Sequence, residues 1–379
     1  MRVVINARTT HYLDRGLGTY SRNLIEALGR VAPEHQYVFI VERDRKLPEI
    51  AWPPQSKFWY TRGGYGSYLY RDVFEQIVLP LGLWRLRADI YHQLDWTLPL
   101  GWVPCPMVTA FHDTIPLTDL DKRPSLSSRR VVFLIKAASR RADRIITISN
   151  YSKNEIVREL GIAENKVTVV YLGVRDPFGE VAASDVDLSA LRDLGISGEY
   201  IFYIGGFQHR KNVATLLRAF RQVLDTYPAI KLVLGGSQSS DSSSVASLAN
   251  QLGIADSVVF TGTLSVEQVA SLMRRATIFV LPSLHEGFGL PVLEAMACGT
   301  PVICSNVTAL PEVAGDAVRS IDPLDVSGFA SAMRQLLADP EARSSLAEAG
   351  RRRAAMFSWD ETARRTREVY EELKGCGKQ

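Results

Sequence analysis

The most informative stretch of this sequence is LHEGFGLPVLEAMACGTP, residues 284–301, which follows the apolar run Ile278–Leu281. Pro291 suits the first turn of a helix, where its missing N–H costs nothing. Gly299 suits the position just past a helix end, and Pro301 prevents continuation. Together these residues predict a strand, a glycine-rich turn and a helix in close succession.

Two glutamates, Glu286 and Glu294, lie in this stretch with seven residues between them. Gly287 and Gly289 let backbone N–H groups approach a ligand closely, and a helix N-terminus favours anionic or hydroxyl-rich ligands. Glu286 is expected in the turn and Glu294 about one helical turn inside the helix, so both can border one cleft. Two glutamates at this spacing are also compatible with a solvated helix start, but the strand and the Pro/Gly punctuation favour a site.

This segment resembles the Glu-x7-Glu signature of family 4 of the retaining, nucleotide-sugar-dependent glycosyltransferases. Its flanks, Pro282-Ser283, Gly299–Ile303 and Ala309–Gly315, are also typical of that family. The resemblance covers most of the chain and is best in the C-terminal half; within the family it is nearest to mannosyltransferases of bacterial surface-polysaccharide assembly. It implies an α/β, GT-B fold: two doubly wound Rossmann-like domains facing across a deep cleft, with the nucleotide sugar bound mainly by the second.

Composition is compatible with this fold. The 379 residues suit two domains, and 46% are hydrophobic. A net charge of +3 is too mild to argue for nucleic acid, but it is compatible with anionic substrates or an anionic membrane surface. No run reaches the roughly 18 apolar residues of a spanning helix, and the start reads as a strand rather than a signal peptide. The four cysteines lack metal spacing, so we expect a reduced, cytoplasmic protein.

Apolar strand-like runs alternate with helical patterns, which predicts parallel sheets covered by helices on both faces. In the first half the runs are Val3–Ile5, Tyr37–Val41, Asp89–His92, Met107–Phe111, Arg144–Ser149 and Val167–Leu172. In the second half they are Tyr200–Gly205, Lys231–Gly235, Val258–Thr261, Ile278–Leu281, Val302–Ser305 and Ala317–Ile321. In such sheets ligands bind outside the C-terminal strand ends.

The domain boundary is expected near Pro177–Gly198, where the sequence turns polar and irregular. We assign residues 1–180 to an N-terminal, acceptor-binding domain and residues 196–355 to a C-terminal domain that binds the nucleotide sugar. Ser358 is suited to cap a last helix, about 358–375. The resemblance implies that this helix packs back on the first domain.

Departure of a nucleotide diphosphate builds negative charge, which fixed cations and backbone N–H groups can stabilise. Arg210 and Lys211 follow a strand and the loop that begins Gly205-Gly206, so they are expected at a strand's C-terminal end. Arg can fork onto phosphate oxygens, and Lys supplies a point charge. Without the resemblance, which implies that they bind the donor diphosphate, a solvated basic pair would be the simpler interpretation.

Metal ligation is not expected. The Asp-x-Asp at Asp185-Val186-Asp187 lies in the presumed linker and follows no strand, and the histidines show no ligand spacing. We therefore predict metal-independent transfer without a cofactor.

The resemblance also implies roles for individual residues. Glu286 would bind hydroxyls of the donor sugar, and Glu294 would hold the ribose hydroxyls, a geometry that suits a carboxylate acceptor. The remaining residues of this donor-binding segment are Ser283, Gly287, Phe288, Gly289 and Leu290.

The first half contributes two further candidates. Gly16 and Gly18 form a Gly-x-Gly turn that the resemblance sets near the donor phosphates and the acceptor; as a bare motif it is weak. His112 ends an apolar strand and would contact the transferred sugar on the acceptor side; the alternative is a strand-end histidine capped by Asp113. Retention in the family is usually drawn as front-face attack, with the acceptor proton passing to the leaving phosphate. We therefore assign no base, and Asp113 is only a minor candidate.

Two segments of the first half have surface interpretations. The basic, amphipathic pattern of residues 129–144 predicts a helix that lies on anionic lipid at the inner membrane face or simply covers the sheet. Aromatic residues crowd Trp52–Phe74 and would either stack on sugar rings or pack against their own domain. The chain departs from the family at Arg175, where Asp is common, and at His285, where Tyr is frequent; both changes bear on the choice of donor or acceptor.

The function predicted from these features is retaining transfer of a hexose, with mannose from GDP-mannose as the first expectation. The acceptor would be a saccharide or a polyprenyl-linked saccharide in surface-polysaccharide synthesis. Two alternatives are a nucleotide-sugar epimerase on the same scaffold and a non-catalytic carbohydrate-binding protein. A dehydrogenase is poorly supported, because the glycine-rich turns lack the Gly-x-Gly-x-x-Gly spacing with a downstream acid.

Overall fold

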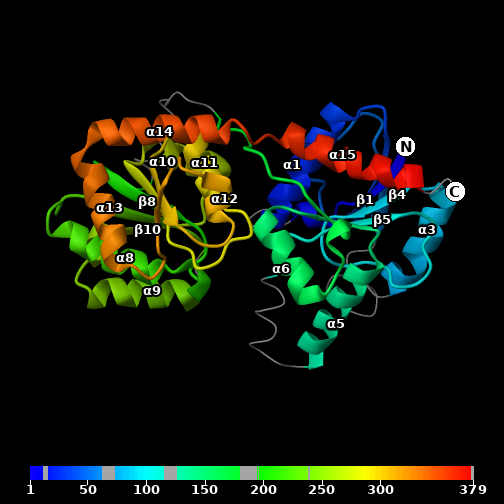
Figure 1. Cartoon of the computed structure of the whole chain (residues 1–379), viewed down its shortest axis with the longest axis horizontal. Coiled ribbons are helices and arrows are strands. Elements are labelled where there is room, and N and C mark those ends of the chain that lie inside the picture. Colours follow the sequence, from blue (N-terminus) through cyan, green and yellow to red (C-terminus); the bar gives the residue numbers. More distant parts are fainter. Residues whose placement is uncertain are drawn as a thin grey trace. The chain divides into compact units, whose positions relative to one another are not determined.

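The computed structural model describes residues 1–11, 16–61, 73–114, 126–179, 194, 196–237 and 240–376. The chain forms two compact units (Figure 1). Unit 1 comprises Met1–Gly173 and Ser358–Gln379, and unit 2 comprises Val174–Phe357. The segment 174–179 thus belongs to unit 2, although the sequence assigned it to the first domain. Most of the expected linker, residues 180–193 and 195, lies outside the described residues.

Unit 1 contains a parallel seven-stranded sheet in the order β3-β2-β1-β4-β5-β6-β7. Its strands are β1 (Arg2–Asn6), β2 (Gln36–Glu42), β3 (Lys57–Thr61), β4 (Ile90–Gln93), β5 (Met107–Ala110), β6 (Arg144–Thr147) and β7 (Val167–Val169). Its helices and helical turns are η1 (Arg8–His11), α1 (Gly16–Val31), η2 (Phe74–Val78), α3 (Leu79–Leu86), α5 (Leu126–Arg141), α6 (Asn150–Leu160), η3 (Glu164–Lys166) and α15 (Trp359–Cys376). The strand order reverses direction between β1 and β4, which is where a doubly wound sheet opens a crevice.

Unit 2 contains a parallel six-stranded sheet in the order β10-β9-β8-β11-β12-β13. Its strands are β8 (Tyr200–Ile204), β9 (Lys231–Gly235), β10 (Val258–Gly262), β11 (Ile278–Leu281), β12 (Val302–Ser305) and β13 (Arg319–Ile321). Its helices and helical turns are η4 (His209–Lys211), α8 (Val213–Leu224), α9 (Ser240–Gln251), η5 (Ala255–Ser257), α10 (Val266–Arg275), α11 (Leu290–Cys298), α12 (Leu310–Ala314), α13 (Val326–Ala338) and α14 (Pro340–Ala354). Here the order reverses between β8 and β11.

The sequence patterns that predicted these sheets have a direct physical counterpart. The central strands β1 and β11 are buried on both faces, which explains their uninterrupted apolar runs. Helix α11 carries Pro291 in its first turn and ends at Gly299, whose φ of 74° is the left-handed conformation of a C-terminal cap. The prediction of two doubly wound, Rossmann-like sheets is therefore confirmed.

Strand β3 was not predicted, because its sequence, KFWYT, was interpreted as part of an aromatic loop. It pairs with β2 at the edge of the sheet. Phe58 packs edge-on against Trp52 at 5.0 Å between ring centroids, and Trp59 lies 5.7 Å from Phe74. These four aromatics therefore pack within unit 1 rather than forming a sugar-stacking loop; Tyr65, Tyr68 and Tyr70 lie outside the described residues.

The last helix, α15, belongs to unit 1 and packs against α1. Ser358 caps it, since its Oγ accepts a hydrogen bond from the Glu361 N–H at 3.1 Å. Asp360 in the first turn binds Arg30 of α1 at 2.8 Å. Deeper in the helix, the Tyr370 hydroxyl lies 2.5 Å from Nδ1 of His92 on β4.

Helix α5 has a buried face that includes Ile135 and Ala138, and exposed basic residues that include Arg129, Arg130 and Lys136. It therefore covers the sheet as an ordinary surface helix would. Within the parts of the chain that the structure describes, no helix is both long and apolar enough to cross a bilayer.

Candidate active site

The loop between β11 and α11 is shaped around Glu286. The Ser283 hydroxyl donates a hydrogen bond to Glu286 Oε1 at 2.7 Å, and the Glu286 N–H donates to Thr308 Oγ1 at 3.2 Å. Gly289 starts the helix with a φ of 95°, and a Cβ there would lie 2.5 Å from Cδ2 of Leu310. A residue with a Cβ would be strained by the positive φ and would clash with Leu310, so the turn that carries Glu286 depends on glycine at position 289.

Hydrogen bonds also fix the loop that follows β8. Gly205 donates its N–H to the Gly235 carbonyl at 3.0 Å, and the Tyr203 hydroxyl donates to the Gly206 carbonyl at 2.5 Å. Arg210 and Lys211 follow in the short helical turn η4, which ends at Asn212 in the left-handed conformation.

Backbone and side-chain bonds join these two loops. The Leu284 N–H donates to the Arg210 carbonyl at 2.8 Å. The Asn212 amide donates to the carbonyls of Pro282 and Pro323 at 2.9 and 2.7 Å. The carboxyl ends of the neighbouring strands β8 and β11 therefore present one continuous polar surface at the point where the strand order reverses.

Lys211 and Glu286 form the centre of this surface. Lys211 Nζ lies 2.6 Å from Glu286 Oε1, and the two side chains are only 12% and 11% exposed. Burial pushes the pKa of Glu286 up, but Lys211, the Ser283 hydroxyl and Arg210 outweigh it, so the pKa falls below its ordinary value and the group is ionised. Burying such a pair is costly, and groups with perturbed pKa values concentrate at functional sites.

Glu294 has a different partner, Arg175. Nε of the guanidinium lies 3.0 Å from Glu294 Oε1, and the side chains are 19% and 7% exposed. The guanidinium also lies over the ring of Phe178, 5.3 Å from its centroid. Burial raises the pKa of Glu294, and Arg175 offsets this only in part. The pKa values of the two glutamates of the signature thus shift in opposite directions, although each is buried beside a cation.

In unit 1, His112 follows the carboxyl end of β5 and packs edge-on against Tyr20, with 4.4 Å between ring centroids. Burial lowers the pKa of His112 to about 4, so its imidazole is neutral at neutral pH. Its Nε2 is buried and has no hydrogen-bond partner among the residues that the structure describes. Asp113 follows it and is partly buried.

The Gly-x-Gly element differs in detail from its prediction. Helix α1 begins at Gly16, so Gly16 and Gly18 lie in its first turn rather than in a loop before it. Gly16 is exposed and Gly18 is buried. The preceding Arg15 lies outside the described residues.

The structure therefore brings Ser283, Glu286 and Lys211 into direct contact and sets Arg210 beside them. Phe288 is buried and packs edge-on against Phe357 at 6.0 Å, so its ring has a structural part in the loop. Leu290 is partly buried in the first turn of α11.

Sequence reasoning missed two partners. Arg175 was noted only as a departure from the family, because residues 119 positions apart give no sequence signal of contact. The second partner is Thr308, which adopts a φ of 60°, unusual for a β-branched residue. No sequence pattern predicts its hydrogen bond with Glu286. Among the described residues, no group of three or more His, Cys, Asp or Glu side chains is arranged to hold a metal ion.

Comparison with known proteins adds evidence for both units. A family model described as "Glycosyltransferase Family 4" matches residues 15–176. A second, described as "Glycosyl transferases group 1", matches residues 193–353. Together they span most of the chain.

Individual relatives point the same way. The chain is 28% identical to O-antigen chain mannosyltransferase B of Escherichia coli, over 98% of this chain and 100% of that protein. It is 31% identical to the serotype-specific mannosyltransferase WbdA of Escherichia coli, but the match covers 77% of this chain and only 36% of that longer protein. Among solved structures, sucrose-phosphate synthase from Thermosynechococcus elongatus superimposes with a TM-score of 0.77 at 23% identity, covering 99% of both chains. This last likeness supports the fold.

Proposed function

Because the chain belongs to the group 1 and family 4 glycosyltransferases and has their GT-B fold, we propose that it transfers a mannosyl residue from GDP-mannose, with retention. The proposed acceptor is a saccharide or a polyprenyl-linked saccharide of a surface polysaccharide. The names of the two mannosyltransferase relatives support this choice of sugar and product. The matched models describe transferases, so the epimerase and non-catalytic alternatives are not carried further.

The observation that carries the proposal is the contact between Lys211 and Glu286. Oε1 of Glu286 accepts hydrogen bonds from both Lys211 and Ser283. We assign Oε2, the other oxygen of the carboxylate, to a hydroxyl of the donor sugar. A carboxylate that stays ionised is a strong acceptor for such a hydroxyl. We therefore assign Glu286 to the sugar that is transferred.

Arg210 and Lys211 are assigned to the departing diphosphate. They follow the carboxyl end of β8, and Arg210 is close enough to Glu286 to lower its pKa. Fixed cations in a partly buried site stabilise developing negative charge without reorganisation at the moment of reaction. We propose that they do so without a metal ion, together with backbone N–H groups of Gly205 and Gly206.

Glu294 is assigned to the ribose of the nucleotide. Glu294 lies within the first turns of α11 and follows Gly287, Gly289 and Leu290 along the chain. We assign those three residues to the sugar and the phosphates. A helix N-terminus is also a favourable place for the phosphates themselves. Nε of Arg175 binds Oε1 of Glu294, so the nucleotide would either share Glu294 with Arg175 or displace it.

The acceptor side is assigned to His112 and Asp113 of unit 1, with Gly16 and Gly18 towards the donor phosphates. A neutral imidazole with an unsatisfied Nε2 can accept from or donate to a sugar hydroxyl without adding charge. No residue is assigned as a base, since the leaving phosphate can take the acceptor proton. We propose that the reaction takes place at the cytoplasmic face of the membrane.

The test is a thermal-shift panel with GDP-, UDP-, ADP- and dTDP-sugars, followed by transfer assays with the sugar that binds. A ligand that binds only the native state raises its melting temperature. GDP-mannose should give the largest shift, and Lys211→Ala should remove it. A larger shift with another nucleotide sugar would overturn the choice of donor, and no shift with any of them would overturn the site.

A further inference from the structure

The outer face of the helical segment 73–86, formed by η2 and α3, is apolar and exposed. Ile77, Leu81 and Trp84 are 56%, 57% and 65% exposed, and Val73 and Val78 are also exposed. Spacings of three and four residues bring these side chains to one side of a helix. The face is therefore continuous rather than a scatter of single residues.

The inner face of the same segment is apolar too. Phe74, Leu79 and Leu83 belong to the buried core of unit 1. Gly82 allows close packing on the sheet, since a Cβ there would lie 2.0 Å from the Trp59 ring. A helix whose inner face is packed on the core normally carries polar residues on its outer face, so the exposed apolar side chains of this segment are unusual.

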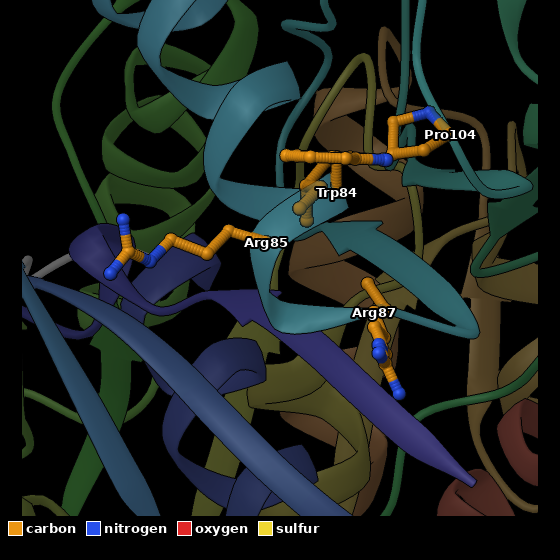
Figure 2. A pocket seen from close by; sticks show the side chains of 6 residues that line it. Trp84, Arg85, Arg87 and Pro104 are labelled. Carbon is orange, nitrogen blue, oxygen red and sulfur yellow. The ribbon is translucent and has the colours of Figure 1, made fainter.

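A neighbouring loop extends this face. Trp102 is 61% exposed, and Pro104 of the same loop borders, with Trp84, a hollow of about 510 Å³. Figure 2 shows Pro104 beside Trp84, with Arg85 and Arg87 projecting from the end of the helix. Of the twelve large hydrophobic side chains that are exposed among the described residues, five lie on the segment 73–86, and a sixth, Trp102, lies in the loop whose Leu100 N–H binds Gln76 and whose Pro104 borders the hollow. Such a concentration marks an interaction site.

The charge on this surface is positive. Arg85 and Arg87 are exposed. The acidic residues of the same segments are turned inward or paired: Glu75 and Asp95 are buried, and Asp89 lies 3.4 Å from Lys374. Tryptophans with flanking arginines are typical of the boundary between lipid headgroups and acyl chains.

We propose that this apolar-basic face, made of Val73, Ile77, Val78, Leu81, Trp84, Arg85, Arg87 and Trp102, docks on the surface of an anionic lipid bilayer. Trp84, Trp102 and Leu81 enter the headgroup region, and the two arginines bind lipid phosphates. A second copy of the chain fits less well, because a two-fold interface would bury the arginines of both copies without an available acidic residue of this face to pair with them. The inference does not depend on the donor site, and it assigns membrane contact to α3 rather than to α5.

The experiment is flotation of the full chain with vesicles of phosphatidylcholine alone and with an equal mixture of phosphatidylcholine and phosphatidylglycerol. The unmodified chain should float with the mixed vesicles. The double variant Leu81→Ser/Trp84→Ser should bind them at least about tenfold more weakly, because each buried apolar side chain contributes about that factor. Arg85→Glu should lose the preference for the anionic lipid.

Matched controls are Phe133→Ser on α5, which removes a side chain with the same 65% exposure as Trp84, and Leu324→Ser in unit 2. Both should float as the unmodified chain does. If the double variant has a lower melting temperature, Trp102→Ser replaces it as the test. The proposal would be overturned if the unmodified chain failed to float with the mixed vesicles. It would also be overturned if Trp102→Ser and Arg85→Glu both floated as well as the unmodified chain. A dimer in sedimentation that the double variant breaks would overturn it too, since a second copy would then cover the face.

Discussion

Arg175 binds Glu294 within unit 2, with 3.0 Å between Nε and Oε1 and with Glu294 only 7% exposed. Burial favours the protonated form of Glu294, and the guanidinium opposes it. Arg175 therefore favours the ionised form of Glu294, the residue that we propose binds the ribose.

The first prediction concerns Arg175→Gln. Without the guanidinium the pKa of Glu294 rises further, and affinity for a ribose that needs the carboxylate is lost as pH falls through that pKa. GDP should bind the variant about tenfold more weakly at pH 6 than at pH 8, whereas the unmodified chain changes less. Titration calorimetry over this pH range is the measurement.

Arg221→Gln serves as the control, because Arg221 pairs with Asp225 on an exposed part of the same unit. It should follow the unmodified chain at each pH. Identical pH profiles for Arg175→Gln and Arg221→Gln would contradict the role of Arg175.

The second prediction concerns Lys211→Met. Loss of one fixed cation that faces the leaving diphosphate should lower kcat by about 100- to 1,000-fold. Because the substitution also leaves Glu286 buried without its main partner, the melting temperature should fall as well. The double variant Lys211→Met/Glu286→Gln should recover stability but not turnover, and Lys231→Met, which removes a partly exposed lysine that binds the Asp256 carbonyl, should retain both. Recovery of turnover in the double variant would argue for a purely structural pair.

The third prediction concerns Gly289→Ala. The positive φ and the contact with Leu310 should together destabilise unit 2 by about 2–4 kcal/mol. Gly253→Ala is the matched control: its φ of 66° is also positive, but a Cβ there meets nothing within 4 Å. It should cost only about 1 kcal/mol. Urea unfolding of the two variants measures the difference, and equal costs would show that the contact with Leu310 relaxes freely.

The fourth prediction concerns His92, which is fully buried beside Tyr370. Burial lowers the pKa of His92 to about 3. The His92 side chain therefore takes up a proton near pH 6.5 in the unfolded chain but stays neutral at that pH in the folded chain. Unit 1 should therefore lose stability as pH falls from about 6.5 towards 3, by about 2 kcal/mol at pH 5. His92→Gln should abolish this part of the pH dependence in denaturant unfolding. An unchanged slope would mean that another group titrates.

The strands were largely predictable from sequence, because both parallel sheets are buried on two faces and their strands read as apolar runs. All twelve predicted runs overlap a strand. Edge strand β3 was missed because it is only partly buried: Phe58 and Trp59 pack on opposite faces, but Lys57 and Tyr60 are exposed, so the strand does not read as a buried apolar run. The strand, turn and helix of the 284–301 stretch were predicted correctly because Pro291 and Gly299 are local signals that act within their own helix.

The site was less accessible to sequence reasoning wherever it depends on distant pairs. Glu286 and Lys211 could be named separately from their own loops, but their contact joins the ends of two strands. The partner of Glu294 comes from a segment 119 residues earlier, which no periodicity reveals. The apolar-basic face on α3 was missed for a related reason: a helix with apolar residues all round looks like a core helix until the exposure of its outer side is known.

The central claim is that Arg210 and Lys211, rather than a bound ion, stabilise the diphosphate as it leaves. The direct measurement is transfer from the nucleotide sugar that binds best, with and without EDTA and with Mg²⁺ or Mn²⁺ added back. The account predicts equal turnover in all of these conditions and a loss of about 100-fold or more with Lys211→Met. Turnover that EDTA abolishes and either metal ion restores would contradict it.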